Sequence, residues 1–417
     1  FPTPKDEDWK FTSVAAITGA DFHPVAGTPD GGTVGRRAAG EGRNPPSLRP
    51  AVAEADLSPH LLAHPEWPRL VLLNGRVAPG LSRLDGLPAG VRLLPLSRAL
   101  AEEPALVEGI FGTVCPAGEN AFVAMNAAYA ADGLVLVVSK GVELATPVHL
   151  LHVTDAAAEG AMIHARNLVL LERQAAATLV ESFVSLADVP AFTNAVSEVR
   201  VGDGARLAHV KIQRQGERAF HVDTTQADQG RDSTWDSFSF AIGGALARTN
   251  LYTRLSGAGS HVTLDGLYIL HGTQHVDHQT RVEHIAPNCT SWEVYKGILD
   301  GASHGVFNGK VYVRPEAQKT DGKQTNNNLV LSDRAKVDTK PQLEIFADDV
   351  KCTHGATVGR LDEGALFYLR SRGLPPAEAR RTLTWGFASD VLQNVASVPV
   401  REHLLRLAKE RLEEAAG

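Results

Sequence analysis

Residues 319 to 375 read KTDGKQTNNNLVLSDRAKVDTKPQLEIFADDVKCTHGATVGRLDEGALFYLRSRGLP, and they join the two patterns that make up most of the chain. The first part sets short runs of Val, Leu and Ile between Asn, Asp and Gly, which is typical of strands separated by turns. The last part, from Asp362, has the spacing of an amphipathic helix. Between them Cys352 and His354 stand two positions apart, so we expect them to share one face of a strand.

The strand pattern extends backward from this segment to about Phe122. Helical three-four spacing is weak throughout, and the apolar runs are of strand length. Representative runs are GLVLVVSKG, ARNLVLLER, ARLAHVKIQ, HVTLDGLYIL, GKVYVRP and NNNLVLS. Turns at Gly204, Gly244, Gly257 and Gly301 recur at unequal distances, so the sequence shows no strict repeat. The series is too long for one ordinary sandwich; a right-handed parallel β-helix would accommodate it, and from the residues alone two sandwiches stay open as the alternative.

The part of the chain before this β region is mixed. We expect residues 1–115 to form a partly helical N-terminal region and residues 116–360 to form the β-helix core. The pair Asn74-Gly75 follows a hydrophobic run and predicts a tight hairpin. Residues 27–50 are dense in Gly, Pro and Arg, which predicts an exposed, mobile loop.

The part after the β region reads as a helical domain, residues 361–417. Asp362 predicts a helix N-cap, and Gly373 predicts the end of that helix. Pro376 suits the first turn of a second helix. A last helix after Pro399 carries Leu404 and Ala408 on one face.

Composition excludes several classes of protein. The net charge is −7 and Lys and Arg form no run beyond short pairs, so a nucleic-acid surface is not expected. No apolar run reaches about 18 residues, the length needed to span a bilayer. Three cysteines, Cys115, Cys289 and Cys352, are far apart and odd in number, which favours a reducing compartment and hence the cytoplasm.

The pair Cys352 and His354 is the strongest candidate for chemistry. Soft sulfur and imidazole together suit Fe(II), an iron–sulfur cluster or Zn²⁺. Two ligands are too few for a closed site, so a second chain would have to complete it. The alternative is structural: a buried Cys352 packed as a small hydrophobic residue beside a hydrogen-bonded histidine.

A histidine-rich segment is the second candidate, with His261, His271, His275, His278 and His284. His275 and Asp277 would share one strand face and His278 would lie opposite. The zinc-protease motif HEXXH is absent. The spacing therefore favours a polar ladder of hydrogen bonds between neighbouring strands over a metal site.

Two enzyme hypotheses are weaker. The stretch GVFNGK, residues 305 to 310, lacks the spacing and the Ser or Thr of a phosphate loop, so ATP binding by this chain is not expected. The acidic pairs Asp348-Asp349 and Asp362-Glu363 suggest the alternative hypothesis of a β-helix enzyme that acts on carbohydrate, since such enzymes use grouped carboxylates. An aromatic content of 6% and the lack of an export signal weigh against it, and Asp362-Glu363 suits the start of a helix.

Three long segments resemble the SufB/SufD family of the SUF iron–sulfur cluster assembly system. They are the opening FPTPKDEDWKFT, residues 1 to 12; DTKPQLEIFADDVKCTHGATVG, residues 338 to 359; and LDEGALFYLRSRGLPPAEARRTLTWGFASDVL, residues 361 to 392. The resemblance covers nearly the whole chain. The segment around Cys352 has the SufD form, and a SufB-type paralogue is the alternative.

The resemblance implies a parallel β-helix and a non-enzymatic scaffold. Such a subunit would pair with SufB through β-helix ends, or with a second copy of itself without SufB, and would bind the SufC ATPase. No cofactor would be bound tightly by the chain alone, while iron or an iron–sulfur cluster would pass transiently through the SufB–SufD interface. The resemblance implies that His354 and Cys352 are related to the cluster or iron at the SufB interface. It also implies that His354 is a metal ligand. The implied SufC-binding residues are Leu361, Asp362, Phe367, Tyr368, Arg370, Arg372, Pro375 and Phe387.

Overall fold

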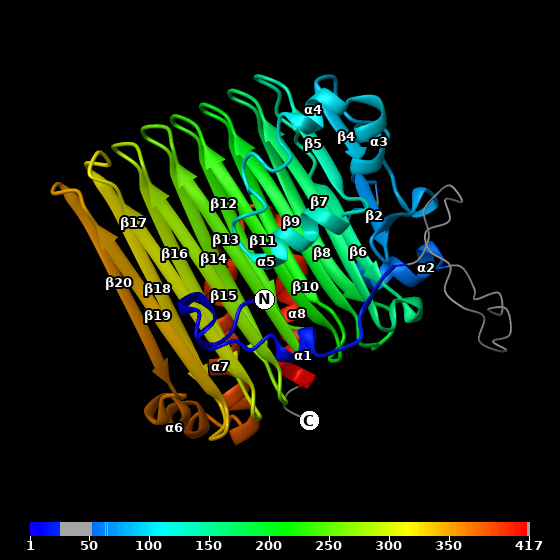
Figure 1. Ribbon diagram of the computed structural model, residues 1–417. Helices are drawn as coiled ribbons and strands as arrows, with labels where there is room; N and C mark the ends of the chain where they lie inside the picture. The colour runs from blue at the N-terminus through cyan, green and yellow to red at the C-terminus, as the bar shows by residue number, and fades with distance from the viewer. Residues whose placement is uncertain (26–51, 63, 65, 415–417) are drawn as a thin grey trace, which may run out of the picture.

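Two parallel sheets stacked face to face form the body of the molecule (Figure 1). The structure, a computed structural model, describes residues 1–25, 52–62, 64 and 66–414. Within these ranges each sheet has ten strands, and the chain alternates between the two sheets from β5 onward. This architecture is a parallel β-helix, so the predicted fold class is confirmed and the two-sandwich alternative is excluded.

The first sheet, sheet A, contains β1 (His23–Pro24), β4 (Val91–Pro95), β5 (Leu134–Val138), β7 (Ala161–Leu171), β9 (Phe192–Val201), β11 (Phe220–Gln229), β13 (Leu246–Leu255), β15 (His275–His284), β17 (His304–Val313) and β19 (Lys336–Ile345). The second sheet, sheet B, contains β2 (Arg69–Leu73), β3 (Arg76–Val77), β6 (Val148–Thr154), β8 (Ala176–Ser185), β10 (Arg206–Arg214), β12 (Thr234–Ala241), β14 (His261–Leu270), β16 (Thr290–Leu299), β18 (Thr320–Val330) and β20 (Val350–Gly359). The α-helices are α1 (Ala15–Thr18), α2 (Glu54–Leu57), α3 (Leu96–Glu102), α4 (Pro104–Glu108), α5 (Ala121–Tyr129), α6 (Glu363–Ser371), α7 (Pro376–Leu392) and α8 (Val398–Glu414). Short 3₁₀ helices lie at Glu7–Trp9, Ser58–His60, Pro79–Leu81 and Ala156–Ala158.

Strand register explains why no strict repeat is visible in the sequence. Phe220 pairs with Leu246, an offset of 26 residues, whereas His304 pairs with Lys336, an offset of 32. The four strands that carry these pairs each have 10 residues, so the turns between them absorb the difference. The turn at Gly257 illustrates the constraint, because a Cβ there would lie 2.0 Å from the backbone nitrogen of Arg231 in the previous coil.

The early coils pack apolar side chains between the two sheets. Leu136, Val169, Leu179 and Val199 are buried in one cluster that reaches Trp235. Since successive residues of a strand point to opposite faces, the other row of each strand faces outward and needs a cover.

Helices supply that cover on both faces. On sheet A, α5 packs over β7 and β9, where the ring of Phe122 lies 5.9 Å from that of Phe192. On sheet B, α7 and α8 lie over the middle strands. Their buried residues Val391 and Leu404 join the cluster that holds Phe238 from β12. No helix in the described part of the chain is both long and apolar enough to cross a membrane.

The N-terminal part contributes directly to the sheets. The hairpin predicted at Asn74-Gly75 joins β2 to β3, and both residues have positive φ, 49° and 80°. Strands β2 and β4 precede residue 116 yet pair with β6 and β5 of the solenoid. The loop predicted at residues 27–50 lies outside the described residues.

Residues 7–12, called here the N-terminal strap, lie across the outer face of sheet A (Figure 1). Trp9 is buried, and the guanidinium of Arg248 on β13 lies 3.5 Å from its ring centroid. Arg248 also donates to the carbonyl of Asp8 at 2.8 Å and pairs with Asp277 at 2.6 Å. Thr12 lies 2.9 Å from the ring of His275, so the strap holds adjacent coils together.

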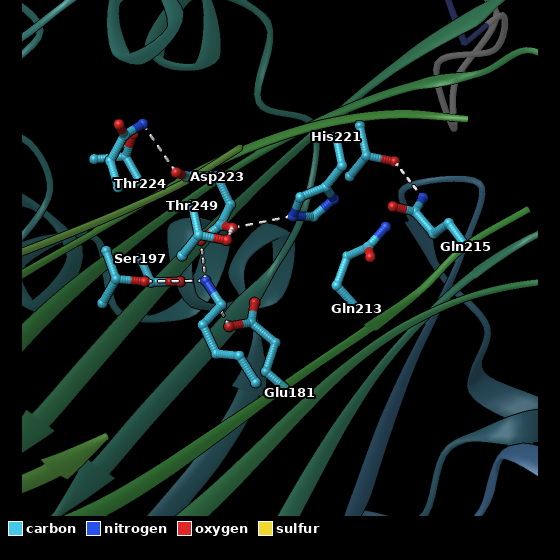
Figure 2. A network of polar contacts seen from close by, with 12 residues as sticks. Glu181, Ser197, Gln213, Gln215, His221, Asp223, Thr224 and Thr249 are labelled. Carbon is cyan, nitrogen blue, oxygen red and sulfur yellow. Dashed lines mark hydrogen bonds and ion pairs between the residues drawn. The ribbon is translucent and has the colours of Figure 1, made fainter. Parts of the chain in front are cut away.

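The middle coils enclose charged side chains between the sheets. Lys211 on β10 pairs with Asp223 on β11 and lies 3.5 Å from Glu181 on β8, and all three are buried. Figure 2 shows Glu181, Ser197, Asp223 and Thr249 converging on this region. Burial alone raises the pKa of Asp223, but Lys211 and then His221 lower that pKa to about 2. The interior therefore holds an ionised triad.

We predict that Lys211→Met destabilises the protein strongly, because it leaves Glu181 and Asp223 buried without their cation. Breaking a buried pair in this way costs about 3–5 kcal/mol. Lys310→Met is the matched control, since Lys310 pairs with Glu344 at 2.7 Å where the two side chains are 34% and 42% exposed. Urea unfolding should show the larger loss for Lys211→Met, and equal losses would contradict an energetically central triad.

We also predict that stability decreases as the pH falls from 6.5 to about 4. Burial lowers the pKa of His278 from 6.5 to about 4, so the unfolded chain takes up a proton in this window that the folded chain refuses. Such a histidine contributes about 1.4 kcal/mol of destabilisation per pH unit. His278→Phe keeps a ring between Tyr268 and Tyr295, at 5.3 and 5.1 Å from His278, and should reduce the slope by about that amount. Urea unfolding at several pH values measures the slope; an unchanged slope would refute the assignment.

Candidate functional site

The last coil of the β-helix, formed by β19 and β20, has no coil beyond it in the described part of the chain. Within the described residues, β20 pairs only with β18, and β19 pairs only with β17 (Figure 1). Each of these strands thus presents one row of backbone N–H and C=O groups without a neighbouring strand, and such an edge is a template for pairing with another chain. The segment singled out in the sequence forms this end of the molecule.

Strand register places Cys352 and His354 in one inward-facing row. Cys352 pairs with Gly322 and His354 pairs with Gln324, and both β18 residues are buried between the sheets. The expectation that thiol and imidazole share a face is therefore confirmed.

The two side chains differ in their surroundings. Cys352 is half-buried and packs against a small cluster that includes Val311 and Val313. His354 is exposed, because no further coil covers it, and makes no hydrogen bond within the described residues. The structural alternative thus suits Cys352 better than His354.

The surroundings of Cys352 also shift the pKa of its thiol. Burial raises the pKa of the Cys352 thiol, the backbone at Gly322 lowers it less, and Asp321 raises it again. Cys352 is therefore a neutral thiol at neutral pH, and a metal ion or a cationic partner would have to lower its pKa before it could bind as thiolate.

The pair does not complete a metal site by itself. In the part of the chain that the structure describes, no three His, Cys, Asp or Glu side chains gather closely enough to hold a metal ion. Two donors at an open edge can contribute to a site only if another surface brings the remaining ligands.

Two residues that sequence reasoning missed lie behind His354. Glu293 on β16 and Gln324 on β18 precede His354 in the same inward row, and both are 1% exposed. Burial raises the pKa of Glu293 to about 7, and hydrogen bonds from Thr280 and Gln324 lower it less. For Gln324 the signal in the sequence was the alternation of inward polar residues in TDGKQTNNN, residues 320 to 328.

The residues expected to bind SufC divide into an exposed group and a supporting group. Phe367 and Tyr368 on α6 are 71% and 56% exposed, and the guanidinium of Arg372 lies 5.4 Å from the Tyr368 ring centroid. Arg370 and Pro375 are exposed beside them. These residues form a surface at the corner where α6 meets α7.

The supporting group either caps α6 or packs toward the body of the protein. Asp362 caps α6 as predicted, by accepting from the backbone N–H of Ala365 at 2.6 Å. Leu361 is half-buried. The ammonium nitrogen of Lys296 on β16 lies 4.7 Å from the ring centroid of Phe387. Phe387 is therefore less available to a partner than its sequence pattern suggested.

The remaining candidates lie within ordinary strands and turns. His275 and Asp277 face the N-terminal strap while His278 faces inward between two tyrosines, as the alternation predicted. The other histidines of this segment bond to neighbouring coils or loops: His261 to Thr290, His271 to Glu217 and His284 to Ser291. Residues 305 to 310 lie in the middle of β17, in extended conformation, and Asp348 and Asp349 lie in the turn before β20.

Comparisons with known proteins agree with the geometry. Residues 152–387 match the family model described as the SUF system FeS cluster assembly SufBD core domain, and residues 66–150 match the SufBD protein N-terminal region. The chain is 32% identical over 413 residues to the iron–sulfur cluster assembly protein SufD of Escherichia coli, covering 99% of this chain and 89% of that protein. It is 33% identical over 402 residues to an iron–sulfur cluster assembly SufBD family protein of Synechocystis, covering 94% of this chain and 84% of that protein.

A more distant relative is the SufD protein of Bacillus subtilis, 28% identical over 330 residues, which span 78% of this chain and 74% of that protein. The family models and the relatives together cover the N-terminal strands, the solenoid and the C-terminal helices. The resemblance drawn from the sequence is confirmed: the chain belongs to the SufB/SufD family of iron–sulfur cluster assembly proteins, as a SufD homologue.

Proposed function

We propose that this chain is a non-catalytic scaffold subunit that helps to build and transfer iron–sulfur clusters in the cytoplasm. It pairs with SufB at the open coil and binds the SufC ATPase on α6 and α7. Without SufB, a second copy of the chain takes the same edge. The observation that carries the proposal is the exposed His354 beside Cys352 in a coil that ends without a neighbour.

The proposal follows from what the open edge lacks. A partner strand along β20 would satisfy its free backbone groups and would bring donors next to His354. Iron or a nascent cluster is then the cargo of a site shared by two chains, and neither chain holds it tightly alone. Cys352, as a neutral thiol behind His354, takes a smaller part.

The ATPase must belong to another subunit, because this sequence has no phosphate loop. Two SufC subunits that dimerise on ATP would pull on the C-terminal helices of SufB and of this chain. The result is a shift between two arrangements of the shared interface, driven by contacts that differ between them. This chain performs no chemical step in that cycle.

We predict that His354→Ala lowers the yield of iron–sulfur cluster severalfold in a complex with SufB and SufC, because the exposed imidazole is lost from the shared site. Cys352→Ser should have a smaller effect. Thr353→Ala is the matched control, since Thr353 is exposed on the same strand and faces the other way. Cluster content is read from visible absorption after reconstitution; a wild-type yield from His354→Ala would rule out this role.

We predict that the double change Tyr368→Ala with Arg372→Glu weakens SufC binding by at least about tenfold without lowering the melting temperature. Aromatic and Arg residues are the usual anchors of an interface, each worth roughly 2 kcal/mol or more. Both side chains are exposed on the corner of α6, so their loss should not disturb the core. The control is Lys409→Glu, an exposed charge change on α8. Wild-type SufC affinity in the double variant would place the docking surface elsewhere.

A further inference from the structure

The inward row that ends at His354 contains a second polar group directly behind it. Glu293 pairs with Gln324, and Gln324 pairs with His354, in neighbouring parallel strands. In-register parallel strands stack equivalent side chains at the strand spacing of about 4.8 Å. Gln324 is therefore the residue next to His354 inside the protein.

Hydrogen bonds fix the orientation of Gln324. The hydroxyl of Thr280 donates to Oε2 of Glu293 at 2.6 Å, and Nε2 of Gln324 donates to Oε1 of the same carboxyl at 3.1 Å. Gly309 on the opposite sheet makes room for this amide, because a Cβ at that position would lie 2.2 Å from Nε2 of Gln324. The nitrogen of the amide is thus held on the side of β16.

The oxygen of the same amide has no partner. Oε1 of Gln324 is buried and accepts no hydrogen bond within the described residues. Because Nε2 of Gln324 bonds to Glu293 on β16, Oε1 is the atom of the amide left for a donor on β20, the neighbouring strand that carries His354. A buried carbonyl oxygen left without a donor is costly, so an adjacent N–H is strongly favoured as its partner.

We propose that Gln324 is the positioning residue of His354: one ring N–H of His354 donates to Oε1 of Gln324, and the chain Thr280–Glu293–Gln324 holds that acceptor in place. The other ring nitrogen then carries a lone pair that faces out of the open coil. Histidines that bind metals generally donate their second N–H to such an acceptor, which fixes the tautomer and the orientation of the ring. The contact itself is inferred from the strand register, and its role in cluster assembly rests on the proposed function of His354.

The chain alone provides the first test, without SufB or SufC. In protein labelled with ¹⁵N-histidine, the ring nitrogen signals at about pH 8 report the tautomer; the signal absent from His354→Ala identifies His354. We expect one dominant tautomer in the wild type and a mixture in Gln324→Leu. Gln213→Leu is the matched control, because Gln213 is also a buried inward glutamine, on a distant coil. Thr280→Val is nearly isosteric and removes the hydroxyl that donates to Glu293. It should also shift His354 from one dominant tautomer toward a mixture.

The complex with SufB and SufC provides the second test. Gln324→Leu should lower the cluster yield about tenfold, as loss of an outer partner of a metal-binding histidine does, while Gln213→Leu should not. An unchanged tautomer signal in both Gln324→Leu and Thr280→Val would overturn the positioning role, even if His354→Ala abolishes assembly. A changed signal with normal assembly in His354→Ala would instead overturn the proposed function and leave the contact in place.

Discussion

In a parallel β-helix each coil completes the hydrogen bonds of the one before it, and the last coil has no successor. The exposure of the candidate site follows from that constraint. Within the described residues, the helices over both sheets cover the outward rows of the middle coils, but no element covers the edge at β20. The residues at that edge, His354 above all, are exposed because the stack stops there rather than because their own sequence is polar.

The same stacking permits an unusual interior. Apolar rows fill the early coils, whereas later coils enclose Lys211 with two carboxylates and, further on, Glu293, which accepts hydrogen bonds from Thr280 and Gln324. Buried charges are tolerated only where partners are held at fixed distances. A solenoid provides such distances, because each coil contacts only the coils before and after it, and strand pairing fixes the spacing between their side chains. The interior is thus rigid enough to keep an amide such as Gln324 in one orientation.

Much of the fold could be predicted from the sequence, and the interior of the site could not. Strand length, the hairpin at Asn74-Gly75 and the cap at Asp362 are local properties, so they were visible without the structure. The shared face of Cys352 and His354 followed from strand alternation alone. The contact of Gln324 with Glu293 depends on which residues of successive coils pair, and coil offsets between 26 and 33 residues hide this pairing. Phe387 lies half-buried against Lys296, and a helical pattern cannot reveal such a placement because it does not say which side of the helix the solenoid occupies.

The N-terminal strap has a consequence for the order of events during synthesis. Its residues leave the ribosome before the strands that they cover, and Arg248, which contacts Asp8, follows 240 residues later. At about 5–20 residues per second, the strap waits roughly 10–50 s for its binding surface. Trp9 is therefore exposed on every nascent chain until the middle coils have been made, and a factor that shields aromatic segments has that interval in which to act. The strap can dock only after β13 and β15 have been made, because its partners Arg248 and Asp277 lie on those strands.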